Sequence, residues 1–318
     1  MSEAYLYPLF FEPIYQYRLW GGRKLADILS APMPNGPIGE AWILSDRDDD
    51  ASVVSNGELK GRTIRQLMTQ FPTQLMGSLA SHFSRFPLLL KFLNAREMLS
   101  VQVHPSGKMA KTEGWVVLEA GADSRIYAGL KSGTTKENLQ SAVTDGKVED
   151  HLVGFTPKCG DAVFIPAGTV HSLGGDIVVL EPQQNSDVTF RLYDWNHIDP
   201  NTGQLRPLQV ADALACINFQ QGEIGPVVPV VEGIGSVTRE RLFVAPPFSL
   251  WRIKSASNFV VGSSLTPHVI VCIEGSGLLQ HASVQYPVKK GNVVLLPAQV
   301  GICTFHPKNP VNLIEIAL

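Results

Sequence analysis

An eleven-residue pattern that occurs twice constrains this fold more than any other feature of the sequence. Residues 157–167 read PKCGDAVFIPA, and residues 288–298 read VKKGNVVLLPA. In each copy a glycine is followed by Asp or Asn, then by an apolar strand that ends at Pro-Ala. A tight turn followed by a strand that stops at proline is typical of a β-barrel corner. Two copies of this corner predict two barrels related by duplication.

The remaining sequence agrees with a β-framework. Short apolar runs rich in Val, Ile and Leu are separated by turn residues, among them 28 glycines and 22 prolines. Helical periodicity is confined to residues 61–84, which Pro72 divides, to residues 135–143 and 148–153, and to a segment that begins at Pro207. These helices do not alternate with strands, which argues against a doubly wound α/β fold.

The length of 318 residues suits two domains. Residues 219–235 are rich in Gly, Pro and Val and show little pattern, so we place the boundary there. Residues 1–218 then form the first barrel, with a helical insertion at about 61–85, and residues 219–318 form the second.

Charge and cysteine usage exclude several functional classes. The net charge of −3 gives no basic footprint for nucleic acid. The N-terminal residues lack the features of a signal peptide, and no apolar stretch is long enough to span a membrane. The four cysteines form no CxxC pair, and we expect them to be reduced, buried and structural. These features predict a cytoplasmic protein without a membrane partner, either a monomer or a weak homo-oligomer.

A metal site is predicted from polar residues on apolar strands. Ser100, Gln102 and His104 alternate with valines, so they share one strand face. Three polar groups on an interior face are costly unless they bind something. Glu113 precedes the next strand, and His171 follows the corner of the first repeat. Two imidazoles, a carboxylate and an amide oxygen suit Zn²⁺ or a similar divalent ion.

The second repeat serves as an internal control for this prediction. Aligning Gly160 with Gly291 puts His171 opposite Ile302, and aligning Gly121 with Gly275 puts Glu113 opposite Pro267. The second copy keeps the corner and lacks the ligands, so we assign the single metal to the first barrel alone. The histidines of the second barrel are expected to be surface or structural residues: His268, His281 and His306.

A further polar strand follows the metal residues. Thr189, Arg191 and Tyr193 share one face of the strand, and Phe190 and Leu192 share the other. An arginine inside a barrel needs an anionic partner. From these residues alone, that partner is either a carboxylate of the protein or a substrate.

At this point the sequence resembles the type I phosphomannose isomerase family, particularly its short bacterial form. The resemblance covers most of residues 1–218 and, more weakly, the C-terminal barrel. The matching strings are GEAW at 39–42, PLLLK at 87–91, SVQVHP at 100–105, KTE at 111–113, GD at 160–161, GTVH at 168–171, NSD at 185–187 and RLYD at 191–194.

The resemblance implies a mainly β fold of two cupin-type (jelly-roll) barrels. It implies a metal-dependent aldose–ketose isomerase that interconverts mannose 6-phosphate and fructose 6-phosphate through an enediol. Zinc would be held by Gln102, His104, Glu113 and His171. The implied catalytic residues are Arg191, Lys111 and Asp187, and Glu181 beside them is a further acid/base candidate. Ser100 and Lys91 match positions associated with the substrate phosphate.

One departure from the family affects the rim of the site. Only eight residues separate His104 from Glu113, where the family usually has a longer segment, so a more open pocket is expected. Other readings also remain open: a non-catalytic, metal-containing cupin that binds or senses sugars, a different cupin enzyme such as a dioxygenase, and a purely structural barrel. A pure binder would have no need for the acid/base group around Lys111, Asp187 and Arg191.

Overall fold

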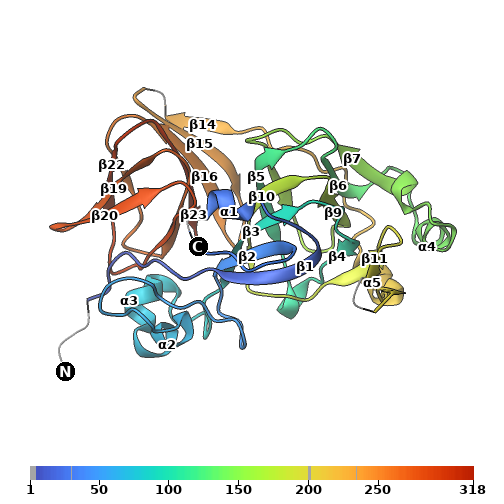
Figure 1. The fold of residues 1–318 in the computed structure, drawn as a ribbon, viewed down its shortest axis with the longest axis horizontal. Helices are drawn as coiled ribbons and strands as arrows, with labels where there is room; N and C mark the ends of the chain where they lie inside the picture. The colour runs from blue at the N-terminus through green and yellow to red at the C-terminus, as the bar shows by residue number, and fades with distance from the viewer. Residues whose placement is uncertain (1–4, 30, 200–201, 234) are drawn as a thin grey trace.

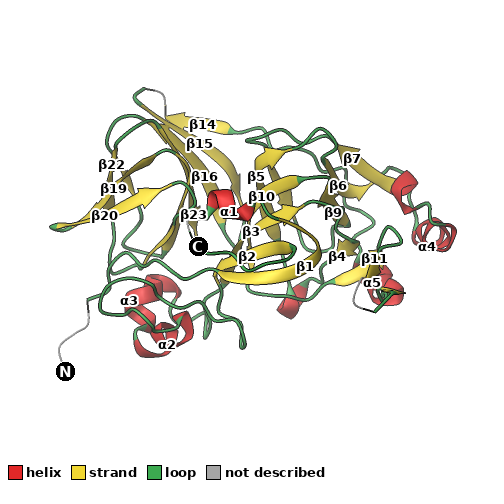
Figure 2. Cartoon of the chain, in the orientation of Figure 1, coloured by secondary structure: helices red, strands yellow, loops and turns green. Residues whose placement is uncertain are grey.

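The computed structural model describes residues 5–29, 31–199, 202–233 and 235–318. The described chain forms two β-units side by side, which we call the first barrel (β1 to β11) and the second barrel (β14 to β23) (Figure 1). Strands dominate both units, and the helices lie at their periphery (Figure 2). The prediction of a mainly β fold is confirmed.

The first barrel pairs a six-stranded antiparallel sheet with a five-stranded one. The larger sheet has the order β1-β2-β3-β10-β5-β8, and the smaller has the order β11-β4-β9-β6-β7. The strands are β1 (Ile14–Gly22), β2 (Ile38–Leu44), β3 (Leu88–Ala95), β4 (Val101–Val103), β5 (Glu113–Ala120), β6 (Arg125–Leu130), β7 (Leu152–Phe155), β8 (Ala162–Ile165), β9 (His171–Gly174), β10 (Ile177–Gln184) and β11 (Phe190–Tyr193). A short hairpin of β12 (Ile198–Asp199) and β13 (Gln204–Leu205) follows.

The second barrel repeats this arrangement. Its larger sheet has the order β14-β15-β16-β23-β18-β21, and its smaller sheet has the order β17-β22-β19-β20. The strands are β14 (Val230–Gly233), β15 (Val237–Val244), β16 (Ser249–Ser255), β17 (Phe259–Val261), β18 (His268–Glu274), β19 (Ser276–His281), β20 (Val284–Lys289), β21 (Val293–Leu296), β22 (Cys303–Pro307) and β23 (Val311–Ala317). The repeated sequences supply β8 and β21, which occupy the same edge of the two larger sheets.

Strand register refines the alignment of the two barrels. Glu113 pairs with Ile165, and His268 pairs with Leu296; Ile165 and Leu296 are the residues before the repeated Pro-Ala. The position of Glu113 is therefore taken by His268 in the second barrel, and not by the neighbouring Pro267. Both barrels carry a bulge at the corresponding point of this strand, so the one-residue difference lies beyond it, in the turn that holds Gly121 and Gly275.

The helices appear near the predicted positions. They are α1 (Leu25–Ile28), α2 (Ile64–Gln70), α3 (Pro72–Met76), α4 (Lys136–Asp145) and α5 (Val210–Cys216), with 3₁₀ turns η1 (Gly77–Leu79), η2 (Gly107–Met109) and η3 (Val148–His151). Pro72 begins α3, as the sequence predicts. The last helix begins at Val210 instead of Pro207, because the backbone N–H of Gln209 bonds the carbonyl of Arg191 at 2.8 Å.

The two barrels share a hydrophobic core. One continuous cluster contains Leu88 of β3 and Val116 of β5 together with Leu250 of β16 and Val269 of β18. The N-terminal segment crosses to the second barrel, where Leu9 and Leu295 exchange two backbone hydrogen bonds of 2.9 Å. The larger sheet of the first barrel, which carries part of the site below, is therefore supported from the second barrel.

Residues 219–229, between the barrels, contain no strand, and their backbone bonds the first barrel. The N–H of Val227 bonds the carbonyl of Ala162 at 2.7 Å, and the N–H of Ile224 bonds that of Ala128 at 3.3 Å. The strands of the second barrel begin only at Val230. The boundary at residue 218 stays a prediction.

The four cysteines are free thiols. Cys272 and Cys303 are buried and Cys216 is half-buried, but Cys159 is exposed. The expectation of burial is wrong for Cys159, because this residue lies in the turn that leads into β8. In the described part of the chain, no helix combines the length and the apolar character needed to cross a membrane. The cytoplasmic location stays a prediction.

Candidate functional site

A row of three residues crosses the smaller sheet of the first barrel. Gln102 on β4 lies opposite His171 on β9 and, on its other side, opposite Arg191 on β11. Residues opposite each other in adjacent strands have their side chains on the same face. The strand pairing therefore brings two predicted metal ligands and the predicted catalytic arginine together.

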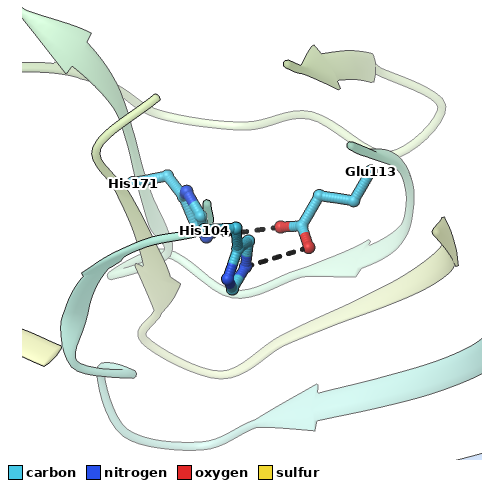
Figure 3. Close-up of side chains that lie close together, drawn as sticks. All are labelled: His104, Glu113 and His171. Atoms are coloured by element: carbon cyan, nitrogen blue, oxygen red, sulfur yellow. Dashed lines mark ion pairs between the residues drawn. The ribbon is translucent and has the colours of Figure 1, made fainter. Parts of the chain in front are cut away.

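His104 and Glu113 complete a compact cluster with His171. His104 Nε2 lies 3.2 Å from Glu113 Oε2, and His171 Nε2 lies 3.3 Å from Glu113 Oε1. Figure 3 shows the two imidazoles converging on the carboxylate. All three side chains are buried, and one ligand atom from each lies within 4.8 Å of the others. This spacing suits a single divalent ion.

The backbone orients both imidazoles. His104 Nδ1 lies 3.0 Å from the carbonyl of Val188, and His171 Nδ1 lies 2.9 Å from the carbonyl of Thr169. A carbonyl only accepts, so each Nδ1 carries the proton and each Nε2 presents its lone pair to Glu113. Burial, aided by the Lys111 charge, lowers the pKa of His104 to about 3, and burial also lowers the pKa of His171. Both rings are therefore neutral, as metal ligands must be.

Gln102 supplies the fourth polar group. Its amide nitrogen lies 3.2 Å from His171 Nε2, and its amide oxygen accepts a 3.3 Å hydrogen bond from Ser100. A half-turn of the terminal amide exchanges these two atoms, which leaves the oxygen beside His171. The side chain thus reaches the space where a fourth ligand belongs.

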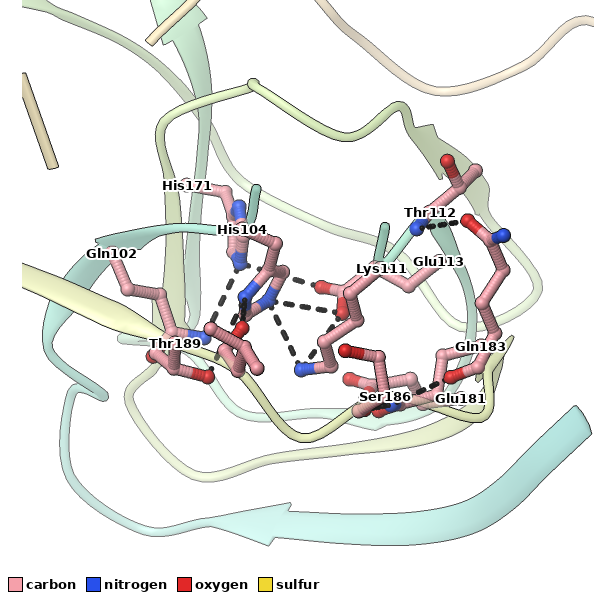
Figure 4. Close-up of polar contacts among 12 residues, drawn as sticks. Gln102, His104, Lys111, Thr112, Glu113, His171, Glu181, Gln183, Ser186 and Thr189 are labelled. Atoms are coloured by element: carbon pink, nitrogen blue, oxygen red, sulfur yellow. Dashed lines mark hydrogen bonds and ion pairs between the residues drawn. The ribbon is translucent and has the colours of Figure 1, made fainter. Parts of the chain in front are cut away.

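The Lys111 ammonium lies beside these candidate metal ligands. Lys111 Nζ is 3.0 Å from His104 Nε2 and 3.3 Å from Glu113 Oε2 (Figure 4). Glu113 Oε2 is buried and has these ion-pair contacts, but no well-formed hydrogen bond to any described residue. Although burial opposes ionisation, the Lys111 charge holds the pKa of Glu113 well below its usual value. An ionised carboxylate and two neutral imidazoles around one point fit a divalent metal.

A cavity of about 370 Å³ opens beside this cluster. Lys91 and Glu181 face each other across β3 and β10 in its wall, and Lys91 Nζ lies 2.9 Å from Glu181 Oε1. Trp115 donates a 2.7 Å hydrogen bond to Glu181 Oε2. Burial and the nearby Glu113 charge raise the pKa of Glu181, although Lys91 opposes the shift. A carboxyl group with a raised pKa suits proton transfer near neutral pH.

The other predicted residues also border the cavity. Ser100 is buried beside Gln102, whereas Asp187 is exposed at the rim. Arg191 lines the cavity, and its Nε lies 3.9 Å from Asp194. Tyr193 does not share the face of Arg191 as expected, because the pairing of β11 with β4 shifts register between them; it packs instead against Trp195.

Three charged residues of the cavity are absent from the predictions made on sequence. Glu40 is buried on β2 and lies 3.7 Å from Lys91. Arg18 lies 3.1 Å from Glu40, and Arg206 enters from the segment after β13. The sequence does mark Glu40, because a charged residue inside the apolar run IGEAWIL indicates a buried charge. Nothing in the local pattern around Arg206 indicates its place.

Comparisons with known proteins agree with this geometry. Residues 9–152 match the family model described as phosphomannose isomerase type I, catalytic domain. The mannose-6-phosphate isomerase ManA of Bacillus subtilis is 35% identical over 311 residues, covering 92% of this chain and 94% of the relative.

Solved structures match over nearly the whole chain. The crystal structure of the Bacillus subtilis mannose 6-phosphate isomerase superposes with a TM-score of 0.88 at 29% identity, covering 98% of this chain and 99% of that one. A zinc-bound holo form of a mannose 6-phosphate isomerase, 15% identical, matches in fold with a TM-score of 0.78 over 98% and 99% of the chains. The family model and the close relative together show that this chain belongs to the type I phosphomannose isomerase family.

Proposed function

We propose that this protein interconverts mannose 6-phosphate and fructose 6-phosphate, with one divalent metal, zinc, held by Gln102, His104, Glu113 and His171. The observation that carries the proposal is the buried Lys91–Glu181 pair in the same cavity wall as the metal cluster. A site that only bound sugar would have no need of a carboxyl group tuned for proton transfer. The sequence relationship and the zinc-bound neighbour support the same substrate and metal.

The bound metal would stabilise negative charge on the sugar oxygens as a Lewis acid. Glu181 takes the proton from C2 of the open-chain aldose, and C2, C1 and their oxygens form an enediol. Glu181 then returns the proton to C1, while the hydroxyl proton moves from O2 to O1. Burial suits Glu181 to this exchange because it raises the pKa of the acceptor.

The remaining residues hold the charge and the sugar. Arg191 offers its guanidinium to the oxygen that becomes negative, since it lies next to Gln102 in the sheet. Lys111, which lies beside Glu113, is placed to carry the hydroxyl proton from O2 to O1 on the side of the sugar that faces the metal ligands. Asp187, exposed at the rim, is suited to opening the sugar ring, and Ser100 to contacting the substrate.

The test combines turnover with metal analysis on the full-length protein. Zinc-loaded wild type is expected to form fructose 6-phosphate from mannose 6-phosphate and to contain one zinc per chain. Glu181→Gln keeps the shape and removes the base, so kcat should fall by ~10²–10⁴-fold while the zinc content stays at one. Zinc-loaded wild type without turnover would overturn the proposal in favour of a non-catalytic sugar binder.

A further inference from the structure

Arg191, the proposed catalytic arginine, lies on an edge strand of the smaller sheet. Among the described strands, β11 pairs with β4 alone. Arg191 lies opposite Gln102, but the register then shifts before Tyr193. A slip of one residue would turn Arg191 to the other face of the sheet. A four-residue edge strand with such a bulge has few ladder contacts to fix its register, so other contacts must contribute.

The outer edge of β11 is covered by Gln209 and not by a strand. The N–H of Arg191 donates to Gln209 Oε1 at 3.0 Å, and the N–H of Gln209 donates to the Arg191 carbonyl at 2.8 Å. One residue thereby makes both of the bonds that a neighbouring antiparallel strand would make at this position. Gln209 is the N-cap residue of α5, but its side chain makes no capping bond to that helix. Its amide oxygen instead serves Arg191.

Trp195 ties the end of β11 to the segment that leads into β4. Its indole N–H donates to the Leu99 carbonyl at 2.6 Å, just before β4 begins. The N–H of Leu99 donates in turn to the carbonyl of Leu173 on β9 at 2.8 Å. The indole bond thus adds a cross-strand contact beyond the point where the β11–β4 register shifts. It anchors β11 to the two strands that carry Gln102 and His171.

The turn that carries Trp195 has an unusual backbone. Trp195 and Asn196 have φ values of 52° and 57°. The N–H of His197 donates to the Asp194 carbonyl at 2.9 Å, as in a type I′ turn, which favours Asn and Gly at its centre. Trp195 is strained there, because its Cβ is crowded in the left-handed conformation. Such strain persists where the surrounding structure imposes it, and it is concentrated at functional sites.

Aromatic packing holds the Trp195 ring against the sheet. Its ring centroid lies 5.5 Å from that of Tyr193 and 5.7 Å from that of Tyr127. Tyr193 belongs to β11 and Tyr127 to β6, so the ring contacts two strands of the sheet as well as the Leu99 carbonyl. Relaxing the turn would break these contacts together, which explains how the strained conformation persists.

We propose that Trp195 and Gln209 are positioning residues, which hold Arg191 in register with Gln102 and so aim its guanidinium at the reacting oxygens. The inference rests on the proposed function, in which Arg191 faces the oxygen that becomes negative. Trp195 and Gln209 are not among the described residues that line the cavity, so they act through Arg191. A shift of about 1 Å in a group that stabilises the transition state can cost ~100-fold in rate.

The first test is Trp195→Phe in the zinc-loaded, full-length protein. Phenylalanine keeps the aromatic packing and removes the indole N–H, so kcat should fall by ~10–100-fold. KM should change by less than about 3-fold, because Arg191 acts mainly on the transition state, and the zinc content should stay at one per chain. The matched control is Trp251→Phe in the second barrel, where the indole N–H donates to Glu232 Oε2 at 2.8 Å. This control should change kcat by less than about 2-fold.

The second test applies even if Trp195→Phe does not fold. Gln209 is only half-buried, so its substitution leaves the hydrophobic core intact. Gln209→Leu removes the acceptor of the Arg191 N–H, and kcat should fall by ~3–10-fold, the value of one hydrogen bond. Gln209→Glu keeps an acceptor at that place and should restore kcat to within about 2-fold of wild type.

A double-mutant cycle separates positioning from a purely structural role. On an Arg191→Lys background, Trp195→Phe should change kcat by less than about 2-fold, because the guanidinium that Trp195 positions is gone. An equal loss of kcat in both backgrounds would overturn the proposal. So would a loss in Trp251→Phe as large as that in Trp195→Phe, or a Gln209→Glu variant as slow as Gln209→Leu.

Amide hydrogen exchange makes the test independent of turnover. Trp195→Phe and Gln209→Leu should each speed exchange in residues 190–193 by ~3–10-fold, because each removes a contact that holds β11. Faster exchange in these variants of a protein whose wild type has no turnover would support the positioning role and overturn the isomerase. Turnover in the wild type, with exchange and kcat unchanged in both variants, would do the reverse.

Discussion

The two barrels place different chemistry at the same position. In the first, Glu113 faces two imidazoles that present lone pairs, and the Lys111 ammonium balances its charge. In the second, His268 occupies the corresponding position and lies 2.8 Å from Glu315. That carboxylate also receives Arg239 at 2.9 Å.

We call His268, Glu315 and Arg239 the closed cluster, because hydrogen-bond donors of the same barrel contact Glu315 Oε1 and the Arg239 guanidinium forms an ion pair with Oε2. Oε2, like Glu113 Oε2, has no well-formed hydrogen bond to any described residue. The N–H of Gly262 donates to Glu315 at 2.9 Å, in addition to the histidine and the arginine. Ile302, at the position aligned with His171, is 64% exposed, and its side chain has no atom that could bind a metal. The comparison shows that a metal site needs lone pairs left unmatched around one point, and not only polar residues inside a barrel.

Replacing a ligand in the first barrel should have the largest effect. His171→Ala removes one imidazole donor, so zinc affinity should fall by more than ~100-fold and turnover with it, since even outer-shell changes cost 10–100-fold. Metal analysis after dialysis and a turnover assay measure this. Ile302→Ala, at the aligned position, is the control and should keep both zinc affinity and turnover. An equal loss of zinc in the two variants would contradict the proposal that the metal belongs to the first barrel alone.

Breaking the closed cluster should affect stability instead. Glu315→Ala leaves Arg239, His268 and Gly262 without their acceptor, so the free energy of unfolding should fall by ~3 kcal/mol. Urea unfolding measures the loss, with zinc content and turnover at 15 °C as parallel readouts that should not change. Zinc loss without a change in stability would indicate that the second barrel takes part in the metal site.

Acid should weaken the first barrel through Glu40. Burial opposes its ionisation, but Lys91 and Arg18 lower the pKa of Glu40 from 4.5 to about 2. A carboxylate with a lowered folded-state pKa stabilises the protein above the unfolded pKa and loses that contribution as the pH falls toward the folded pKa. Between pH 6 and pH 3.5 the loss should be about 1.4 kcal/mol.

The measurement is urea unfolding at the two pH values in wild type and Glu40→Gln. Between the two pH values, the free energy of unfolding of the variant should lack this part of the decrease. The variant is less stable than wild type at pH 6, because Lys91 and Arg18 lose a partner. An identical slope in the two proteins would assign the acid sensitivity to other carboxylates, with Glu315 of the second barrel as the next candidate.

Strand alternation was sufficient to predict that these polar side chains gather at one place. Gln102 and His104 share a face because side chains alternate, and His171 follows a corner that the repeat marks. The two barrels could be predicted from the repeat, because the sequences that form β8 and β21 are short local patterns.

Residue positions that depend on strand register or on the path of a long loop were not predicted from the sequence. Strand register, and not the alignment of the turn glycines, puts His268 at the position of Glu113, and a bulge turns Tyr193 away from Arg191. A bulge leaves no reliable mark in a single sequence. Arg206 reaches the cavity through a loop path, which periodicity does not describe.

The bridge between Leu9 and Leu295 has a consequence for synthesis of the chain. The segment around Leu9 leaves the ribosome long before its partner, since Leu295 of β21 emerges 286 residues later. Leu75 of α3 likewise waits for Ala298, whose N–H bonds its carbonyl at 3.0 Å. Contacts of such large sequence separation form slowly. The ribosome therefore holds a first barrel whose N-terminal segment and helical insertion stay undocked until β21 and Ala298 of the second barrel have been made.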